Sequence, residues 1–476
     1  MTMTSKPRVV LYNPQAVFFT MPLALMALGS ALDRARYDVR IIDGRLESDP
    51  VAAVIDAIAA GDTICLGVSV LTGAPIRDAL RITRAVKRRR PDLPVVWGGW
   101  HPSLFPEHTL DGAGIDAAVV GQGEATLVEI VERLAAGERL DGVPGAVTIG
   151  DDGAPVHGPP RPMGDINQLP AHDYGLIPVD GYFRLKRRRQ IDYISSQGCR
   201  FRCTFCADPY VYRRGWFGLE PERIGDELAV LSARHHVEDV GFQDETFFTS
   251  VARVSAIAEQ FLRRDLRFTW TATMRADQGA RIDDQVLAAA RRSGLRRVMV
   301  GVEAGTQTLL DWMKKDITLD QVYETAEKCR RTGVGVIFNL IVGFPDEPPD
   351  SVDASMRVAK RLRAMSPDFE VAIFYYKPYP GNEIADRLVA QGYRHPDTLD
   401  GWADFDYVTS GSPWIRREMR TRVERFKFYQ RIGWARRTAL RAPLQALARW
   451  RCAHDIYGFP IEQHVVEWLR PDARLS

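Results

Sequence analysis

The sequence predicts an α/β protein with a doubly wound, Rossmann-like N-terminal domain, a partial (β/α)6, TIM-like barrel and a C-terminal helical extension. Short apolar runs alternate with amphipathic helical segments over most of the chain, and the last part turns helical, aromatic and basic. The 476 residues, 45% hydrophobic and 26% charged, suffice for two or three globular domains. The predicted boundaries are 1–145, a linker over 146–189, 190–399 and 400–476.

The first third predicts a parallel sheet covered on both faces. Each short apolar run is followed by a helical segment, which is typical of doubly wound domains. Strands are expected at 8–14, 37–43, 62–70, 93–99 and 115–121, and helices at 21–32, 49–60, 76–90 and 124–137. From about Gly145 to Arg189 the alternation stops, and many Pro, Gly and Asp residues predict a linker on the surface.

Three glycine-containing loops, 71–75, 98–107 and 121–126, follow strands of this predicted sheet. In open α/β domains the ligand lies beyond the carboxyl ends of the strands, and glycine lets the backbone approach it closely. The loops are therefore candidates for ligand binding. Ordinary turn glycines explain the residues equally well.

The middle of the chain predicts about six strand–helix repeats, which fit a full or partial parallel barrel. Its first strand, 190–199, leads into "GCRFRCTFC", where Cys199, Cys203 and Cys206 fall within eight residues. Three thiolates with no fourth Cys or His nearby fit a four-iron cluster that keeps one iron open, with zinc or chance spacing as alternatives.

The other three cysteines, Cys65, Cys329 and Cys452, are scattered, which does not suggest a disulfide framework. The sequence shows neither a signal-peptide pattern nor an apolar run of bilayer length, so a cytoplasmic location is expected. A net charge of +2 gives the whole chain no electrostatic signature for nucleic acid.

"GCRFRCTFC", with the aromatic Phe205 before its last cysteine, resembles the Cys-x3-Cys-x2-Cys signature of radical SAM enzymes. Later segments resemble the strand-end motifs of that superfamily in the same order: FQDETF (242–247), MRAD (274–277), GVEAGTQTLLDWMKK (301–315), IVGFPDE (341–347) and PYPGNE (378–383). The N-terminal domain resembles the cobalamin-binding domain of the cobalamin-dependent branch, which includes carbon methyltransferases and the anaerobic cyclase of chlorophyll synthesis. The resemblance covers roughly Arg8 to Leu388.

The resemblance implies that Cys199, Cys203 and Cys206 bind three irons of a 4Fe–4S cluster and that S-adenosylmethionine (SAM) binds the fourth. An electron from the cluster would cleave SAM to a 5′-deoxyadenosyl radical. Further SAM contacts are expected from Phe205, Asp244, Glu245, Arg275, Glu303 and Gly343. A carboxylate accepts hydrogen bonds from ribose hydroxyls or an amino group, and an arginine fork suits the SAM carboxylate. Solvated loop charges or ion pairs are the alternative for the charged residues.

Cobalamin is the third cofactor that the resemblance implies. The residues expected to hold it are Leu71, Thr72, Gly73, Gly98, Gly99, His101, Pro102, Gly121, Gln122, Gly123 and Glu124. The segment "QAVFFTMPLA" after the first strand lacks the histidine of an Asp-x-His-x-x-Gly motif, so binding without a histidine ligand from that motif is expected. His101 is expected to hydrogen-bond the cofactor or the backbone rather than to bind cobalt.

The tail from Asp400 onward predicts basic, aromatic helices. Its basic residues within 26 positions are Arg416, Arg417, Arg420, Arg422, Arg425, Lys427, Arg431, Arg436, Arg437 and Arg441. The favoured interpretation is a cap over the barrel mouth with a solvated basic face; contact with an anionic membrane surface is the alternative. Nucleic acid is disfavoured, because the aromatic residues follow helical spacing.

These observations favour a cobalamin-dependent radical SAM methyltransferase that acts on an unactivated carbon, or on phosphorus, of a small molecule, lipid or secondary metabolite. A radical oxidoreductase or cyclase of the chlorophyll-cyclase type is the alternative, and a non-catalytic cobalamin or iron–sulfur binding protein is a third hypothesis. The expected partners are a small-molecule substrate and an external electron donor such as flavodoxin or ferredoxin.

Overall fold

The computed structural model describes residues 6–111, 114–348, 350–405, 413–435 and 442–463. The chain divides into two compact units. The first comprises Met1–Thr273, Arg292–Gly294 and Pro378–Asp406, and the second comprises Met274–Arg291, Leu295–Lys377 and Tyr407–Ser476. Each unit is described by itself.

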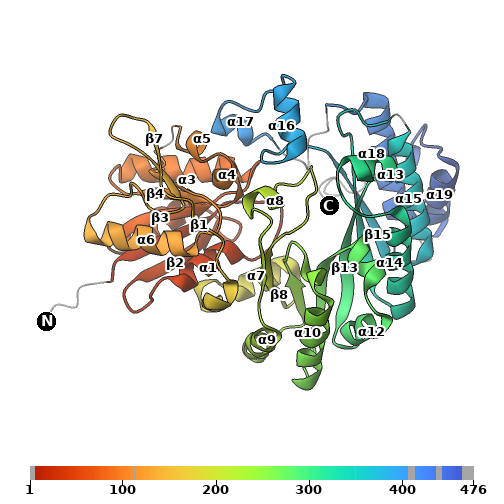
Figure 1. The fold of residues 1–476 in the computed structure, drawn as a ribbon, viewed down its shortest axis with the longest axis horizontal. Coiled ribbons are helices and arrows are strands. Elements are labelled where there is room, and N and C mark those ends of the chain that lie inside the picture. The colour runs from red at the N-terminus through yellow and green to blue at the C-terminus, as the bar shows by residue number, and fades with distance from the viewer. Residues whose placement is uncertain (1–5, 112–113, 349, 406–412, 436–441, 464–476) are drawn as a thin grey trace. The chain divides into compact units, whose positions relative to one another are not determined.

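The first unit opens with a seven-stranded sheet in the order β2-β1-β3-β4-β5-β6-β7 (Figure 1). Its strands are β1 (Arg8–Asn13), β2 (Asp38–Asp43), β3 (Thr63–Ser69), β4 (Val95–Gly98), β5 (Ala117–Val119), β6 (Ala146–Ile149) and β7 (Pro155–His157). β1 to β5 pair in parallel, so their carboxyl ends share one edge. The predicted doubly wound domain is confirmed.

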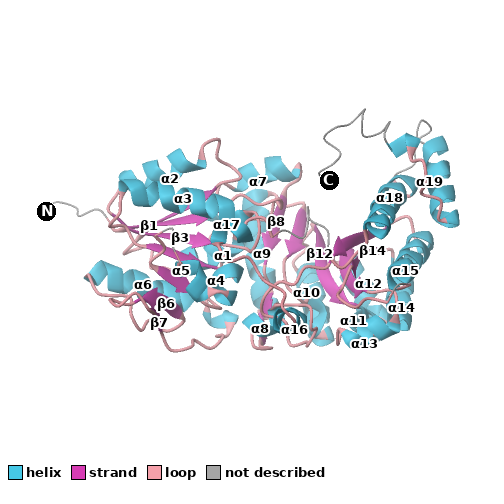
Figure 2. Cartoon of the chain, turned by 90° about the horizontal axis from the view of Figure 1, so that it is seen from above, coloured by secondary structure: helices cyan, strands magenta, loops and turns pink. Residues whose placement is uncertain are grey.

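Helices cover both faces of this sheet. They are α1 (Leu23–Ala31), α2 (Pro50–Ala59), α3 (Pro75–Arg89), α4 (Trp100–Leu104), α5 (Pro106–Leu110) and α6 (Glu124–Ala136). α2 and α3 lie on one face and α6 on the other (Figure 2). Alternate residues of β1 explain this: Val10 and Tyr12 join the core under α2 and α3, while Val9 and Leu11 pack with α1 and α6.

The linker contains more structure than its composition predicts. β6 and β7 form an antiparallel hairpin that extends the sheet beyond β5. The connecting turn passes through Gly153, whose φ of +79° is the left-handed conformation that glycine adopts without strain. After the hairpin come two 3-10 turns, η1 (Ile166–Gln168) and η2 (Tyr174–Leu176), and α7 (Val179–Lys186).

Six parallel strands follow, as predicted for the partial barrel, in the order β15-β14-β13-β12-β11-β8. β8 (Gln190–Tyr193), β11 (Asp239–Phe242) and β12 (Thr269–Arg275) come first, and the boundary between the two units falls inside β12. β13 (Leu295–Glu303), β14 (Gly335–Val342) and β15 (Phe369–Tyr375) belong to the second unit. The intervening helices include α9 (Pro221–His235), α10 (Val251–Arg263), α11 (Ala276–Arg281), α12 (Asp284–Arg292), α13 (Gln307–Trp312), α14 (Leu319–Thr332) and α15 (Ser351–Met365).

The strand predicted at 190–199 is interrupted, which corrects the prediction. β8 ends at Tyr193, and β9 (Ser196–Gly198) leaves the sheet to pair antiparallel with β10 (Trp216–Gly218). The short helix α8 (Asp208–Val211) lies between these two strands in the sequence. The cysteine loop therefore lies in the connection between the two strands of a small antiparallel hairpin.

The predicted tail is divided between the units. α16 (Glu383–Ala390) and α17 (Leu399–Trp402) belong to the first unit, where Trp402 joins the core under α3 and Asp400 pairs with Arg84 at 2.7 Å. α18 (Arg417–Gly433) and α19 (Ala442–His454) belong to the second. This grouping differs from the predicted boundary at residue 400.

Aromatic side chains of α18 point inward: Phe426 and Tyr429 are fully buried, while most of the basic residues stay at the surface. Arg436, Arg437 and Arg441 lie outside the described residues. Within the described ranges, no helix combines the length and apolar character needed to span a membrane.

Candidate functional site

The cysteine loop begins at Gly198, in the first unit. Gly198 has a φ of +94°, and a Cβ built on it would lie 2.3 Å from the carbonyl oxygen of Gly215. Only glycine fits here, because a side chain would collide with the neighbouring backbone. Cys199 is buried, and Cys203 and Cys206 are partly exposed. All six cysteines of the chain are thiols rather than disulfide partners.

Two adjacent carboxylates after β11 hold this loop. Asp244 accepts hydrogen bonds from the backbone N–H of Ser195 at 2.7 Å and from the hydroxyls of Ser195 and Ser196 at 2.6 Å. Glu245 accepts from the backbone N–H of Gly198 at 3.2 Å and from the Tyr212 hydroxyl at 2.9 Å. These bonds explain why the strand breaks after β8: Asp244 competes with the sheet for the backbone of Ser195.

Without a bound metal centre, the surroundings of the loop disfavour negative charge on its acidic side chains and thiols. Burial, reinforced by the charge of Asp208, raises the pKa of Glu245 to about 7. Burial likewise raises the pKa of Asp208 to about 6 and that of the Cys206 thiol well above its ordinary value. A positively charged metal centre would reverse this cost, since it stabilises thiolates and nearby carboxylates.

The cysteine loop supplies three thiol ligands for a metal centre. Among the described residues, no group of three His, Cys, Asp or Glu side chains converges on one metal position. A 4Fe–4S cluster makes a different demand, because each thiolate binds its own iron and the three sulfurs stay apart. Cys199 and Cys203 both act electrostatically on the Cys206 thiol, so the three thiols lie near one another in the loop. Phe205 is partly exposed between Cys203 and Cys206.

In the second unit, Arg275 and Glu303 stand at the carboxyl ends of β12 and β13. Arg275 donates to Asp277 at 2.9 Å and to the Lys315 carbonyl at 2.6 Å, and Lys315 Nζ donates to Glu303 at 2.7 Å. Glu303 has a φ of +68°, a strained conformation for a residue with a side chain. A Cβ on Gly301 would lie 2.1 Å from the Glu303 carboxylate, so this glycine makes room for the ion pair.

Gly343 follows β14 with a φ of +81°. Its backbone N–H donates to Glu347 at 2.5 Å, and that of Phe344 donates to the same carboxylate at 3.0 Å. Glu347 therefore fixes the turn that follows this strand. The expected SAM contacts of Phe205, Asp244, Glu245, Arg275, Glu303 and Gly343 stay predictions.

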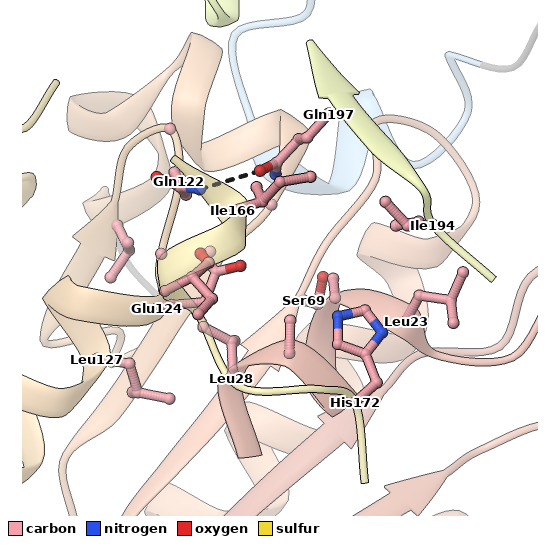
Figure 3. Close-up of a pocket in the computed structure, with 18 of the residues that line it drawn as sticks. Leu23, Leu28, Ser69, Gln122, Glu124, Leu127, Ile166, His172, Ile194 and Gln197 are labelled. Atoms are coloured by element: carbon pink, nitrogen blue, oxygen red, sulfur yellow. Dashed lines mark hydrogen bonds between the residues drawn. The ribbon is translucent and has the colours of Figure 1, made fainter. Parts of the chain in front are cut away.

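A cavity of about 370 Å³ lies in the first unit at the carboxyl edge of the N-terminal sheet (Figure 3). Its inner wall is apolar and reaches behind the loops to Leu11, Gly67 and Val96, which lie within β1, β3 and β4, and to Leu127 of α6. A Cβ on Gly67 would lie 2.7 Å from a methyl carbon of Leu11, so glycine keeps this inner part open.

The structure brings most of the expected cobalamin residues to this cavity. Those that line it are Leu71, Gly98, Gly99, Gly121, Gln122, Gly123 and Glu124. Gly99 has a φ of +95°, and a Cβ on it would lie 3.0 Å from the backbone of Val70. The fold therefore requires glycine at this loop. Thr72, Gly73, His101 and Pro102 are not among the lining residues.

His101 is a core residue. It is fully buried, its Nδ1 lies 3.2 Å from the Thr72 hydroxyl, and its ring packs against Phe105, His108 and Trp402. Burial lowers its pKa to about 3, so the ring is neutral at physiological pH. His101 was expected to hydrogen-bond the cofactor or the backbone, and its ring contacts the Thr72 hydroxyl instead. His101 does not line the cavity.

Sequence reasoning missed several residues of the cavity wall. Ser69 ends β3, Tyr193 and Ile194 come from the end of β8, and Ile166, Leu169, Pro170 and His172 come from the linker. Ser69 could have been predicted from the sequence, since it precedes the loop 71–75. The linker residues carry no such signal, because their place in the wall depends on how the chain folds back.

Comparison with known families identifies both halves of the site. A model of the B12 binding domain matches residues 11–131, and a model of the Radical SAM superfamily matches residues 193–359. The chain therefore contains a B12 binding domain followed by a radical SAM domain. Its cofactors are a 4Fe–4S cluster, SAM and cobalamin.

The chain is similar to an uncharacterized methyltransferase of Pyrococcus horikoshii, with 29% identity over 82% of this chain and 84% of the relative. It is also similar to the anaerobic magnesium-protoporphyrin IX monomethyl ester cyclase of Rubrivivax gelatinosus, with 26% identity over 68% of this chain and 58% of the relative.

Two solved structures share the fold. One is the radical SAM methyltransferase TsrM from Kitasatospora setae, with a TM-score of 0.69 and 22% identity over 82% of this chain and 78% of that one. The other is the cobalamin-dependent radical SAM enzyme OxsB, with a TM-score of 0.74 and 17% identity over 99% of this chain and 74% of that one.

Proposed function

We propose that this enzyme methylates a carbon or phosphorus centre of a small-molecule substrate, with SAM as the methyl source. One observation carries the proposal. Glu245 binds the backbone at the start of the cysteine loop and also lines the cavity formed by the glycine loops of the B12 binding domain. A single carboxylate therefore belongs to both cofactor sites, which supports chemistry that uses the two cofactors together.

The cluster site depends on residues with distinct tasks. Cys199, Cys203 and Cys206 would hold the irons, while Asp244 and Glu245 position the loop through Ser195 and Gly198. When bound, the cluster supplies single electrons to SAM, and cobalamin supplies a carrier for the methyl group. Because both carboxylates are already hydrogen-bonded, their first role is to shape the loop.

The second unit offers a charged group suited to a zwitterionic cosubstrate. Arg275, Lys315 and Glu303 form a buried chain of contacts at two strand ends. We propose that Glu303 accepts hydrogen bonds from the ribose or amino group of SAM and that Arg275 faces its carboxylate. The strained backbone of Glu303 supports this role, since strain of this kind persists chiefly at functional positions.

The proposed reaction balances with an external reductant. A substrate C–H or P–H bond, two SAM molecules and two electrons give the methylated product, S-adenosylhomocysteine, methionine and 5′-deoxyadenosine. The electrons would come from a donor protein of the ferredoxin or flavodoxin class.

The test is anaerobic reconstitution with iron, sulfide, cobalamin, SAM and a reductant, followed by mass spectrometry. We expect both 5′-deoxyadenosine and S-adenosylhomocysteine. With SAM that carries a deuterated methyl group, the label should appear in the methylated substrate once a substrate is supplied, and S-adenosylhomocysteine should be unlabelled. The matched control is the Cys206→Ala variant, which keeps the B12 binding domain intact.

A second candidate is a radical oxidoreductase of the cyclase type, which the similarity to the magnesium-protoporphyrin ester cyclase favours. That function would give 5′-deoxyadenosine without S-adenosylhomocysteine. Binding of SAM with neither product would support the third hypothesis, a non-catalytic binding protein.

A further inference from the structure

The linker forms part of the cavity wall and is firmly attached to α9. Arg223 donates to the carbonyl oxygens of Asn167 and Leu169 at 2.9 Å and pairs with Glu227 at 2.6 Å.

 Glu227 also accepts from the Tyr193 hydroxyl at 2.6 Å. The wall formed by Leu169 and its neighbours is therefore fixed by several hydrogen bonds and one ion pair rather than lying loosely on the surface.

His172 is the polar side chain that this wall presents to the cavity. Its imidazole points into the cavity near Ser69 and Leu23 in Figure 3. Within the described part of the chain, neither ring nitrogen has a hydrogen-bond partner. Burial lowers the pKa of His172 to about 4, with the charges of Glu227 and Arg223 acting in opposite directions. The ring is thus neutral at pH 7 and offers one donor and one acceptor.

The shape of the cavity indicates which part of a cobalamin reaches His172. The inner wall of Leu11, Gly67, Val96 and Leu127 is apolar, and the whole cavity measures about 370 Å³. A flat benzimidazole base with its ribose and phosphate fits such a volume. The corrin macrocycle with its amide side chains is too large for this volume.

We infer that His172 hydrogen-bonds the ribose–phosphate portion of the cobalamin nucleotide tail, so that the linker helps to select cobalamins that carry a tail. This inference rests on the cobalamin binding assumed in the proposed function. The apolar inner space takes the base, and the ribose and phosphate then need polar partners at its entrance. Ser69 and the unpaired imidazole of His172 provide them.

The experiment compares two ligands on the full-length protein. Cobalamin and cobinamide, which lacks the nucleotide tail, are titrated by equilibrium dialysis against the wild type, His172→Ala and His172→Gln. We expect His172→Ala to weaken cobalamin binding about tenfold and to leave cobinamide binding unchanged. The glutamine variant, which keeps a donor and an acceptor, should recover most of the loss. His157→Ala, an exposed histidine on β7, is the matched control.

Several results would overturn the inference. Equal weakening of both ligands in His172→Gln, or no change for either ligand in His172→Ala, would show that His172 does not contact the tail. A nitrogen splitting in the EPR spectrum of cob(II)inamide bound to the wild type, lost in His172→Ala, would make His172 a cobalt ligand instead. If the wild type does not bind cobalamin at all, both the proposed function and the inference about His172 fail. If the wild type binds cobalamin and one of the results above is obtained, only the inference about His172 fails.

Discussion

The cysteine loop and the cavity of the first unit are built in opposite ways. The loop, from Cys199 to Cys206, takes its three predicted ligands from eight consecutive residues and is held by two adjacent carboxylates. The cavity takes its wall from strand ends of the N-terminal sheet, from α1 and α6, from the linker and from β8. Its lining residues span Leu11 to Glu245 in the sequence.

Because of this difference, we expect the cysteine loop and the cavity to tolerate substitutions differently. A local site fails when one ligand is removed, because no other residue can replace it. A cavity formed by many segments distributes its binding energy, so most single changes cost little unless they fill the space. Glu245 and the contact between Gln122 and Gln197 are the points where the two regions meet.

The largest effect is expected from Cys206→Ala. Loss of one of three thiolates should abolish the cluster, so iron and sulfide content and 5′-deoxyadenosine formation should both fall to background. Cys65→Ala removes a buried thiol of β3 and is the control, with iron content expected to stay at the wild-type level. Full iron content in Cys206→Ala would show that the loop does not bind the cluster as proposed.

Next is Ala27→Phe, which fills the cavity from α1. We expect cobalamin binding to weaken by more than about tenfold, or roughly 1.4 kcal/mol, while iron content stays unchanged. The control is Ala52→Phe at an exposed position of α2, on the other face of the sheet. If cobalamin titrations show wild-type affinity for Ala27→Phe, the cavity is not its binding site.

An intermediate effect is expected from Glu245→Gln, read as pH dependence in the cluster-free protein. The pKa of Glu245 is about 7 in the folded chain against an ordinary 4.5. Between these values the folded state holds a proton that the unfolded state has lost. The free energy of unfolding of the wild type therefore falls as pH rises from about 4.5 to 7, and the loss is complete above 7.

The glutamine variant lacks this titration, so its stability relative to the wild type should rise by roughly 1–3 kcal/mol between pH 5 and pH 8. Urea unfolding at four pH values measures the difference. Glu47→Gln, the same substitution at an exposed position, is measured as the matched control. Parallel pH profiles for the wild type and Glu245→Gln would contradict the assigned proton.

The smallest effect concerns the contact between the two regions. Gln122 donates to Gln197 at 3.0 Å and accepts from the Gly164 backbone at 2.7 Å. Gln122→Ala should lower the free energy of unfolding by about 1 kcal/mol, since it leaves a backbone donor without that acceptor. In a double-mutant cycle with Gln197→Ala, a coupling of about 0.5 kcal/mol is expected, and strictly additive effects would show that the contact carries no energy.

Much of the fold could be predicted because its signals are local. Alternating residues of β1 divide between two cores, and that alternation is visible in the sequence as a strand between helices. The hairpin of β6 and β7 was missed, although the Asp152–Gly153 pair between two short apolar runs is a hairpin signal. The Pro-rich composition of the surrounding segment predicted a surface linker instead.

The candidate site likewise contains residues that local patterns predict and residues that they do not. The three cysteines were predicted because their spacing as a ligand set lies within eight consecutive residues. Asp244 and Glu245 were predicted as SAM contacts, and the structure adds their hydrogen bonds to the loop backbone. His101 was predicted among the cobalamin residues and packs instead in an aromatic core, since Trp402, some 300 residues later in the chain, lies against its ring.

By itself the sequence determined the alternation of strands and helices in the two parallel sheets, the cysteine ligand set and the glycines that the loops require. These depend on backbone conformation and on the spacing of neighbouring residues. Only the tertiary structure decided that His172 of the linker faces the cavity, that Glu245 joins the two regions and that Trp402 and Phe405 join the core under α3. Such contacts join residues far apart in the sequence, and burial against a common core, rather than any local pattern, brings them together.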